Sequence, residues 1–280
     1  MLCLLDADIV AYRCAAASEN ETLDIALYRV GELVRRVLHD VGATEYEAYL
    51  SGTGSYRKAL DSTYKANRTQ ERPKWLEDCR EYLITEWKAK VTETIEADDA
   101  IGIAANSASE NDLRVTVASV DKDLLQIPTK HYQWEIRGVV KGKEWIKPAA
   151  FHYITPLDGI KHFYKQMLIG DKADNITGVM GVGEVKASKA IDPLFEEIDM
   201  FNTVWSLYTD KQRFFTNAQL LWILKNSENQ HEILSHFLSL PLQGEAAELL
   251  SSHISRVTQD LGLEPIVPQT ALPSLNSGCQ

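Results

Sequence analysis

Acidic side chains gather at four places in the sequence where an apolar run gives way to a turn or a helix. These places hold, in order, Asp6, then Glu96, Asp98 and Asp99, then Asp121 and Asp123, and finally Asp171 and Asp174. Apolar neighbours would draw these side chains inward, and burying so many carboxylates without counter-charge would cost more than the whole stability of a fold. Divalent cations supply that counter-charge, and oxygen-only ligands favour Mg²⁺ or Mn²⁺ over zinc. The acids therefore predict a metal centre.

The number and spacing of the acids indicate two metal ions. On a strand, Asp121 and Asp123 point to the same side, and on a helix Asp171 and Asp174 share a face. Eight carboxylates are too many for one Mg²⁺, which keeps several waters. Two metal ions about 4 Å apart would use them for in-line attack on a phosphodiester. The alternative is that the acids are helix N-caps and solvated loop residues.

The elements that must position these acids alternate between strand and helix. Apolar runs predict strands at 2–5 and 46–50 and again just before Asp121, and helical spacing predicts helices at 9–18, 23–39 and 75–90. A further helix begins at the acids 96–99. This alternation is typical of an α/β fold with a central, mostly parallel sheet flanked by helices, whose ligand sites lie outside the carboxyl ends of the strands.

The second half of the chain changes pattern. Residues 132–147 are expected to form a β-hairpin, and the sequence beyond 156 is helical apart from a glycine-rich loop at 178–183. One of these helices, over 217–226, is amphipathic and is expected to cap the core. We therefore divide the chain into an α/β core at 1–155, a helical region at 156–263, and a Pro/Ser-rich, mobile tail at 264–280.

Composition excludes several classes of protein. The 280 residues are 45% hydrophobic and 25% charged, with 15 Gly and 9 Pro, so collagen-like, disordered and low-complexity chains are excluded. No apolar run approaches the roughly 20 residues that cross a bilayer, and the start MLCLLDADIV lacks the basic region of a signal peptide. The four cysteines have no CxxC spacing, so neither a disulfide framework nor a zinc site is expected, and a reducing cytoplasm is the default location.

A basic stretch stands out in a chain whose net charge is −11. Between 55 and 74 there are two acids and six bases, namely Arg57, Lys58, Lys65, Arg68, Arg72 and Lys74. Such a stretch is typical of a nucleic-acid contact, and Tyr56 and Tyr64 could stack on an unpaired base. The alternative is a solvated basic loop.

The glycine-rich loop offers a second phosphate contact. Gly178, Gly181 and Gly183 are spaced for a tight turn whose N–H groups can approach a phosphate, with Lys186 and Lys189 on the helix that follows. A helix C-cap would explain one glycine but not three. The segment is not a nucleotide-binding P-loop, because it lacks the GK[ST] ending.

The histidines and tryptophans give weaker signals. None of the seven histidines has metal-ligand spacing, so we expect them to be structural or exposed. Four tryptophans are expected to pack in the core or the hairpin, namely Trp134, Trp145, Trp205 and Trp222.

The order of LLDAD, TYKANR, EADDAIG, SVDKDLLQI and GDKADNITGVMGVG resembles the 5′-nuclease (flap endonuclease) superfamily over roughly residues 1–230. The likeness is greatest to bacteriophage 5′–3′ exonucleases and to the nuclease domain of bacterial DNA polymerase I. It implies a PIN-like core, a helical arch at about 53–90 and a helix–hairpin–helix-like DNA-binding motif at about 171–192.

The resemblance also implies roles for individual residues. One metal ion would be held by Asp6, Glu96, Asp98 and Asp121, the second by Asp123, Asp171 and Asp174, with Asp99 beside both. Lys65 and Arg68 would be catalytic, steadying the scissile phosphate. DNA would be bound by these two residues together with Arg57, Lys58, Tyr64, Gly178, Gly181, Gly183, Lys186 and Lys189. The glycine loop of the family often holds K⁺.

The activity implied is hydrolysis of phosphodiesters near the 5′ end of DNA, and of RNA in RNA–DNA duplexes, in phage replication or primer removal. The protein would be a monomer in the host cytoplasm, using two Mg²⁺ ions or Mn²⁺ in their place. One departure stands out, because Gly52 replaces a metal-side aspartate of the family. Two alternatives follow: a flap- or junction-binding protein with weakened cleavage, or an RNase of a smaller PIN-like fold. The basic stretch and the glycine loop argue against the RNase.

Overall fold

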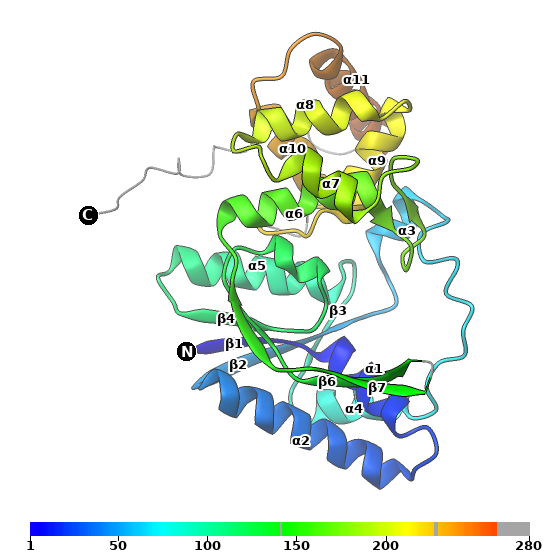
Figure 1. Ribbon diagram of the computed structural model, residues 1–280, viewed down its shortest axis with the longest axis vertical. Helices are drawn as coiled ribbons and strands as arrows, with labels where there is room; N and C mark the ends of the chain where they lie inside the picture. Colours follow the sequence, from blue (N-terminus) through cyan, green and yellow to red (C-terminus); the bar gives the residue numbers. More distant parts are fainter. Residues whose placement is uncertain (141, 227–228, 262–280) are drawn as a thin grey trace.

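A six-stranded sheet forms the centre of the computed structural model, which describes residues 1–140, 142–226 and 229–261 (Figure 1). The strand order is β3-β2-β1-β4-β5-β8. The strands are β1 (Leu2–Asp6), β2 (Glu45–Ser51), β3 (Lys90–Thr92), β4 (Val115–Ala118), β5 (Lys130–Gln133) and β8 (Ala150–Tyr153). β8 runs antiparallel to β5, whereas the other pairings are parallel. The predicted mostly parallel sheet is confirmed.

Helices cover both faces of this sheet. α1 (Ala7–Ala17), α2 (Leu23–Val41) and α4 (Leu76–Thr85) pack together on one face, and α5 (Ala97–Glu110) contacts β1, β2 and β4 from the other (Figure 1). With cover on both sides, β1 and β4 are buried almost throughout. This burial explains why they read as short continuous apolar runs rather than alternating ones.

The chain beyond Pro156 is helical and builds a second, aromatic core. The helices are α6 (Pro156–Ile169), α7 (Glu184–Ile191), α8 (Glu197–Leu207), α9 (Lys211–Leu221), α10 (Glu232–Ser239) and α11 (Glu245–Leu261). Phe201 meets Phe214 and Phe237 edge-on, with ring centroids 5.2 and 5.0 Å apart, the arrangement that aromatic quadrupoles favour. None of the described helices is long and apolar enough to cross a membrane. The predicted tail 264–280 lies outside the described residues.

The helix predicted over 217–226 ends earlier, at Leu221. From Trp222 the chain runs extended, and the N–H groups of the next two residues bind side chains of the α/β core instead of helical carbonyls. The Ile223 N–H donates to Gln126 at 3.3 Å, and the Leu224 N–H donates to Asp99 at 3.1 Å. This stretch therefore joins the helical region to the α/β core.

The segment predicted as a helical arch, 53–90, is helical in two places. α3 (Tyr56–Leu60) is short, and α4 packs on α1 and α2 as part of the sheet's cover. The stretch between them, residues 61–75, contains turns and no helix. Residues 61–75 are thus the longest stretch of the predicted arch without a helix.

The hairpin predicted at 132–147 is present and extends further than expected. β5 and β8 form its base within the sheet, and β6 (Ile136–Val140) pairs with β7 (Lys143–Lys147) as a separate two-stranded ribbon. The ribbon therefore prolongs the β5–β8 pair beyond the sheet.

Candidate active site

Acidic side chains converge at the carboxyl ends of the parallel strands. Asp6 is the last residue of β1 and caps α1, accepting a hydrogen bond from the Ile9 N–H at 3.1 Å. Its second oxygen accepts from the Ser119 hydroxyl at 2.6 Å. Ser119 follows β4, so this bond joins the ends of two neighbouring strands. The Asp6 carboxylate is 1% exposed and fixed in direction.

Asp121 and Asp123 lie close together, but not on a strand as predicted. β4 ends at Ala118, Asp121 lies in the loop that follows, and Asp123 opens a short 3₁₀ helix, η1 (Asp123–Gln126). Asp121 accepts from the Asp123 N–H at 2.9 Å, so a turn rather than a pleat sets their spacing. Gln166 of α6 donates to Asp123 at 2.7 Å.

Asp171 and Asp174 also share a side through a turn, where a helix was expected. Asp171 ends β9 (Gly170–Asp171), which pairs with β10 (Ile176–Thr177). One Asp171 oxygen accepts from the N–H groups of Ala173 and Asp174 at 2.6 and 3.2 Å. A carboxylate that binds the backbone two and three residues ahead stabilises a turn.

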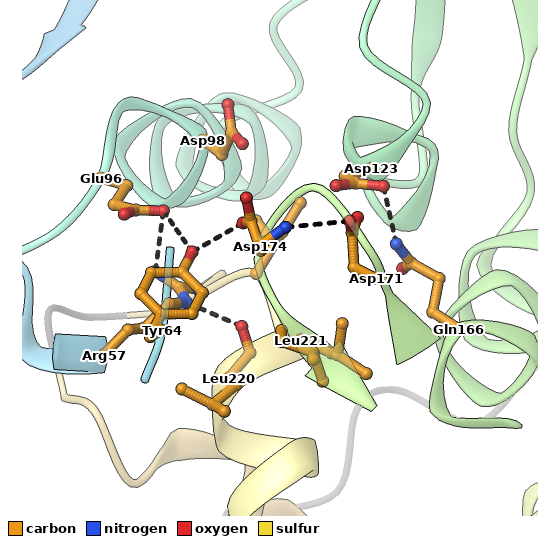
Figure 2. Close-up of a pocket in the computed structure, with 12 residues that line it drawn as sticks. Arg57, Tyr64, Glu96, Asp98, Asp123, Gln166, Asp171, Asp174, Leu220 and Leu221 are labelled. Carbon is orange, nitrogen blue, oxygen red and sulfur yellow. Dashed lines mark hydrogen bonds and ion pairs between the residues drawn. The ribbon is translucent and has the colours of Figure 1, made fainter. Parts of the chain in front are cut away.

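These segments meet around one small pocket of about 30 Å³ (Figure 2). Its acidic lining comes from the start of α5, from η1 and from the β9–β10 pair, and its remaining wall from α3, Tyr64, α6, β10 and the end of α9. The acids that line it are Glu96, Asp98, Asp123, Asp171 and Asp174. Three segments far apart in sequence thus bring carboxylates to one pocket.

Asp6 and two of the carboxylates that line the pocket, Asp98 and Asp123, lack adequate counter-charge. Burial, together with the charge of Asp121, raises the pKa of Asp123 to about 7. Burial and the nearby charges of Asp8 and Asp121 raise the pKa of Asp6 to about 7, against a hydrogen bond from Ser119 that lowers it. Burial and the charges of Asp6 and Asp121 raise the pKa of Asp98 well above its usual range. Buried carboxylates that repel one another fit a site for a bound cation.

The donor chemistry fits a hard divalent ion, because every one of these side chains offers oxygen. Within the described ranges, no three His, Cys, Asp or Glu side chains are grouped closely enough to hold a metal ion as they stand. The carboxylates therefore line one pocket, but they lie farther apart than the ligands of a bound metal ion.

Lys65 and Arg68 point at the acids. The Lys65 ammonium lies 2.7 Å from Glu96 and 3.6 Å from Asp174, and the Arg68 guanidinium pairs with Asp174. Burial opposes ionisation of Glu96, but Arg57 and Lys65 outweigh it and lower the pKa of Glu96 below its usual value. The basic stretch is thus tied to one side of the acidic pocket, whereas Asp98 and Asp123 on the other side form no ion pair with the residues that the structure describes.

The structure contradicts the roles predicted for Arg57 and Asp99. Arg57 was expected to bind DNA and Asp99 to lie beside the metals, yet they are 3% and 0% exposed and form a bidentate pair at 2.5 and 2.8 Å. Arg57 also donates to the carbonyls of Leu220 and Trp222 at 2.8 and 2.7 Å. With its hydrogen bonds directed to these buried groups, Arg57 cannot reach a nucleic acid. The pair joins α3, α5 and the end of α9.

Tyr64 also differs from the prediction. Its ring is 4% exposed, so it cannot stack on a base, and its hydroxyl lies 3.0 Å from Glu96 and 2.9 Å from Asp174. Tyr64 therefore bridges two of the acids. Lys58, by contrast, is exposed as a DNA contact requires.

Gly52 is a glycine for a steric reason. A Cβ atom there would lie 2.1 Å from the Thr92 carbonyl oxygen, so no larger residue fits unless the backbone moves. The acid that lies at the end of β2 comes from α1 and is Asp8. Asp8 accepts from the Ser51 N–H at 2.8 Å and pairs with Arg80, which also donates to the Ser51 carbonyl at 2.6 Å.

The glycine-rich loop divides into a packed and an open part. Gly178 fits against the end of α6, where a Cβ would lie 2.4 Å from the Leu168 carbonyl oxygen. Gly181 has a left-handed backbone with φ +74°, and a Cβ at Gly181 or Gly183 would meet nothing within 4 Å. Gly178 is thus required for packing. At Gly181 and Gly183 no neighbouring atom covers the side of the backbone where a Cβ would lie. Lys186 and Lys189 are exposed, and Lys186 binds the Gly181 carbonyl at 2.8 Å.

Sequence reasoning missed three residues of the site: Ser119, Gln166 and Arg80. Each is a single polar side chain that donates a hydrogen bond to an acid of another segment: Ser119 to Asp6, Gln166 to Asp123 and Arg80 to Asp8. Ser119 opens the SVDKDLLQI motif without being recognised as a site residue, and no motif quoted from the sequence contains Gln166 or Arg80.

Comparisons with known proteins agree with this architecture. Residues 1–153 match the family described as "5'-3' exonuclease, N-terminal resolvase-like domain". The chain is 30% identical to DNA polymerase I of Bacillus subtilis over 71% of its own length and 24% of that protein, so it spans about a quarter of such relatives. It is 26% identical to a 5'-3' exonuclease of Mycoplasma pneumoniae, over 70% of this chain and 75% of that one.

Solved structures show the same fold. The T5 D15 protein co-crystallised with metal ions has a TM-score of 0.56 at 16% identity, covering 93% of this chain and 94% of that one. The T5 D15 flap endonuclease in a pseudo-enzyme-product complex with DNA and metal ions gives 0.55 at 17% identity, covering 92% and 94%. Since the family model covers more than half of its residues, the chain belongs to the 5′–3′ exonuclease family with the N-terminal resolvase-like domain.

Proposed function

We propose that this protein is a divalent-metal-dependent 5′–3′ exonuclease and structure-specific flap endonuclease that hydrolyses phosphodiesters near the 5′ end of DNA. The observation that carries this proposal is the convergence of acids from three segments on one pocket, with Lys65 and Arg68 bound to two of those acids. Family membership supports nuclease chemistry, and the T5 D15 complex, which holds DNA and metal ions, supports the substrate and the cofactor.

Two groups of residues would hold the metal ions, Mg²⁺ or Mn²⁺. The first is formed by Asp6, Glu96, Asp98 and Asp121, and the second by Asp123, Asp171 and Asp174. Bound there, the ions would activate a water and stabilise the leaving oxygen. Asp99 is left out of both groups because it is committed to Arg57.

The chain's own cations position the phosphate. Lys65 and Arg68 lie against Glu96 and Asp174, so a phosphodiester brought to these acids would lie within their reach and receive their charge. Tyr64 fixes the Glu96 and Asp174 carboxylates relative to each other through its hydroxyl. Asp8 supplies the acid at the end of β2, where Gly52 leaves no room for a side chain.

Further parts of the proposal concern substrate and setting. The glycine loop would hold duplex DNA through its open backbone at Gly181 and Gly183 and through Lys186 and Lys189. A K⁺ ion there would use carbonyls other than that of Gly181, which Lys186 already binds. Cleavage of RNA in RNA–DNA duplexes, a role in phage replication or primer removal, a monomeric state and a cytoplasmic location complete the proposal.

A 5′-labelled flap substrate, incubated with Mg²⁺, Mn²⁺ or EDTA, tests the proposal. We expect cutting with either metal, none with EDTA, and 5′-phosphate products. Asp123→Asn should reduce the rate at least 100-fold, and Asp24→Asn, which changes an exposed acid on α2, should leave it unchanged. A wild-type protein that binds the flap tightly but never cuts it would instead establish the alternative, a flap- or junction-binding protein.

A further inference from the structure

The β6–β7 ribbon carries an unusual surface for a chain with a net charge of −11. Residues 134–149 contain four bases and two acids. Its apolar side chains are also unusually open, since Val139 is 65%, Val140 59%, Ile146 56% and Trp145 40% exposed. A two-stranded ribbon cannot bury many apolar side chains by itself, and an exposed apolar patch is typical of a binding surface.

One face of the ribbon combines the basic and aromatic residues. Because alternate residues of a strand share a face, Lys143, Trp145 and Lys147 point to the same side of β7. Trp145 lies across Gly138, its pair on β6, where a Cβ would be 2.6 Å from the indole. The glycine thus makes room for the ring. Neither lysine forms an ion pair or hydrogen bond with the described residues.

The opposite face has different chemistry. Arg137 is paired with Ile146 across the ribbon, and its guanidinium is bound by Glu135 at 2.8 Å. Val139 faces Glu144. Among the described residues of the ribbon, the cations without an ion pair and the tryptophan therefore share the face of Lys143, Trp145 and Lys147, which we call the KWK face.

The ribbon projects from the edge of the sheet that holds the acids. β5 runs parallel to β4, so its carboxyl end lies at the same edge as Asp6 and Asp121. β6 begins only two residues after β5, separated by Trp134 and Glu135. Figure 1 shows the ribbon extending toward the side where β1 ends and α1 begins.

We propose that the KWK face binds unpaired nucleotides of the nucleic-acid strand that is cut at the acidic pocket. This inference rests on the proposed function and adds a contact outside the pocket, the basic stretch and the glycine loop. Trp145 supplies a stacking surface for one base, which a single strand offers and a duplex does not. Lys143 and Lys147, four residues and thus about 13 Å apart along the strand, flank the ring and would neutralise phosphates on either side.

Fluorescence anisotropy of a labelled oligo(dT) with EDTA present measures this contact without cleavage. Trp145→Leu keeps an apolar side chain over Gly138 but removes the π face, and should weaken binding about 5- to 100-fold, the range of base–aromatic stacking. Trp145→Tyr should restore most of the affinity. Replacing both lysines by Gln should flatten the slope of log affinity against log salt by about 1.4.

The opposite face provides the matched control. Ile146→Ala removes exposed apolar area from the same strand and should leave oligo(dT) affinity within twofold. Melting curves of each variant separate loss of the contact from loss of the fold. A duplex of equal length should be bound equally by wild type and Trp145→Leu, and an oligo(U) arm distinguishes DNA from RNA as the strand.

Two results would overturn the inference. The first is an oligo(dT) affinity that Trp145→Leu leaves unchanged, and the second is a wild-type dimer in sedimentation that Trp145→Leu dissociates, since the face would then bind a second copy. Unchanged affinity combined with metal-dependent flap cutting defeats this inference alone. A wild-type protein that neither binds nor cuts DNA defeats the proposed function as well.

Discussion

Replacing Arg57 by Met tests whether the basic stretch contains a structural residue rather than a DNA contact. The Arg57 guanidinium directs four hydrogen bonds, two to Asp99 and one each to the carbonyls of Leu220 and Trp222. Both members of the pair are inaccessible, with Arg57 3% and Asp99 0% exposed. In Arg57→Met the new side chain has a similar length, but the Asp99 charge stays buried without its partner.

The expected loss of stability is large for this reason. Removing one partner of a buried ion pair typically costs about 3–5 kcal/mol, because the remaining charge is uncompensated. For a protein of this size each kcal/mol corresponds to about 2–4 °C in melting temperature. We therefore expect Arg57→Met to lower the melting temperature by about 6–20 °C. Asp99→Asn in the same chain removes the orphaned charge while keeping an acceptor for the Leu224 N–H, and should restore part of the loss.

Urea unfolding of the wild type, both single variants and the double variant provides the measurement. We expect the double variant to be more stable than the sum of the single effects predicts, by at least about 1 kcal/mol. DNA affinity, measured well below the melting temperature, should be the same for Arg57→Met and wild type. Additive losses, or a variant of unchanged stability that binds DNA weakly, would refute the reasoning.

Three further predictions concern the strand end at Gly52 and a buried histidine. Gly52→Asp should lower the melting temperature and not speed cutting, because its Cβ would meet the Thr92 carbonyl oxygen, while Gly183→Ala should be neutral in the same melt. Asp8→Asn should slow flap cutting about 10- to 100-fold in a single-turnover assay, as for residues that support metal ligands. Burial lowers the pKa of His253 from 6.5 to about 4, so the unfolded chain binds more protons between these values and stability rises with pH across them. From pH 7 to pH 5, wild type should lose about 1–2 kcal/mol more unfolding free energy than His253→Gln.

Much of the fold could be predicted because local patterns agree with the tertiary arrangement. The apolar run at 2–5, predicted as a strand, forms the central strand β1 (Leu2–Asp6), and the helix predicted at 23–39 is α2 (Leu23–Val41). Three of the acid clusters lie at the same edge because they follow β1, β3 and β4 of one parallel sheet, whereas Asp171 and Asp174 come from the separate β9–β10 pair. For Asp121 and Asp171 the sequence predicted that each lies close to a second acid. It did not predict the turns that bring the two acids of each pair together.

The errors at the site share a physical cause. The charge of Arg57 is visible in the sequence, but its burial depends on Leu220 and Trp222, more than 160 positions away. Asp99 lies next to Asp98 in sequence, yet one helix position turns it toward Arg57 and away from the pocket. Trp145 was expected to pack in the hairpin, and it does contact Gly138, but it remains 40% exposed. Long-range partners decide the burial of Arg57 and Asp99, and periodicity does not encode them.

Charge balance links the two sides of the pocket. Lys65 and Arg68 neutralise Glu96 and Asp174, whereas Asp98 and Asp123 are left with raised pKa values. A cation entering the pocket therefore gains most beside Asp98 and Asp123, and must compete with the chain's own cations beside Glu96 and Asp174. Because a phosphate attracts the same two basic residues, nucleic acid arriving at the pocket would draw them from the carboxylates and increase the pocket's affinity for cations. Binding of the strand and of the ions should accordingly be cooperative, each strengthening the other by the same factor.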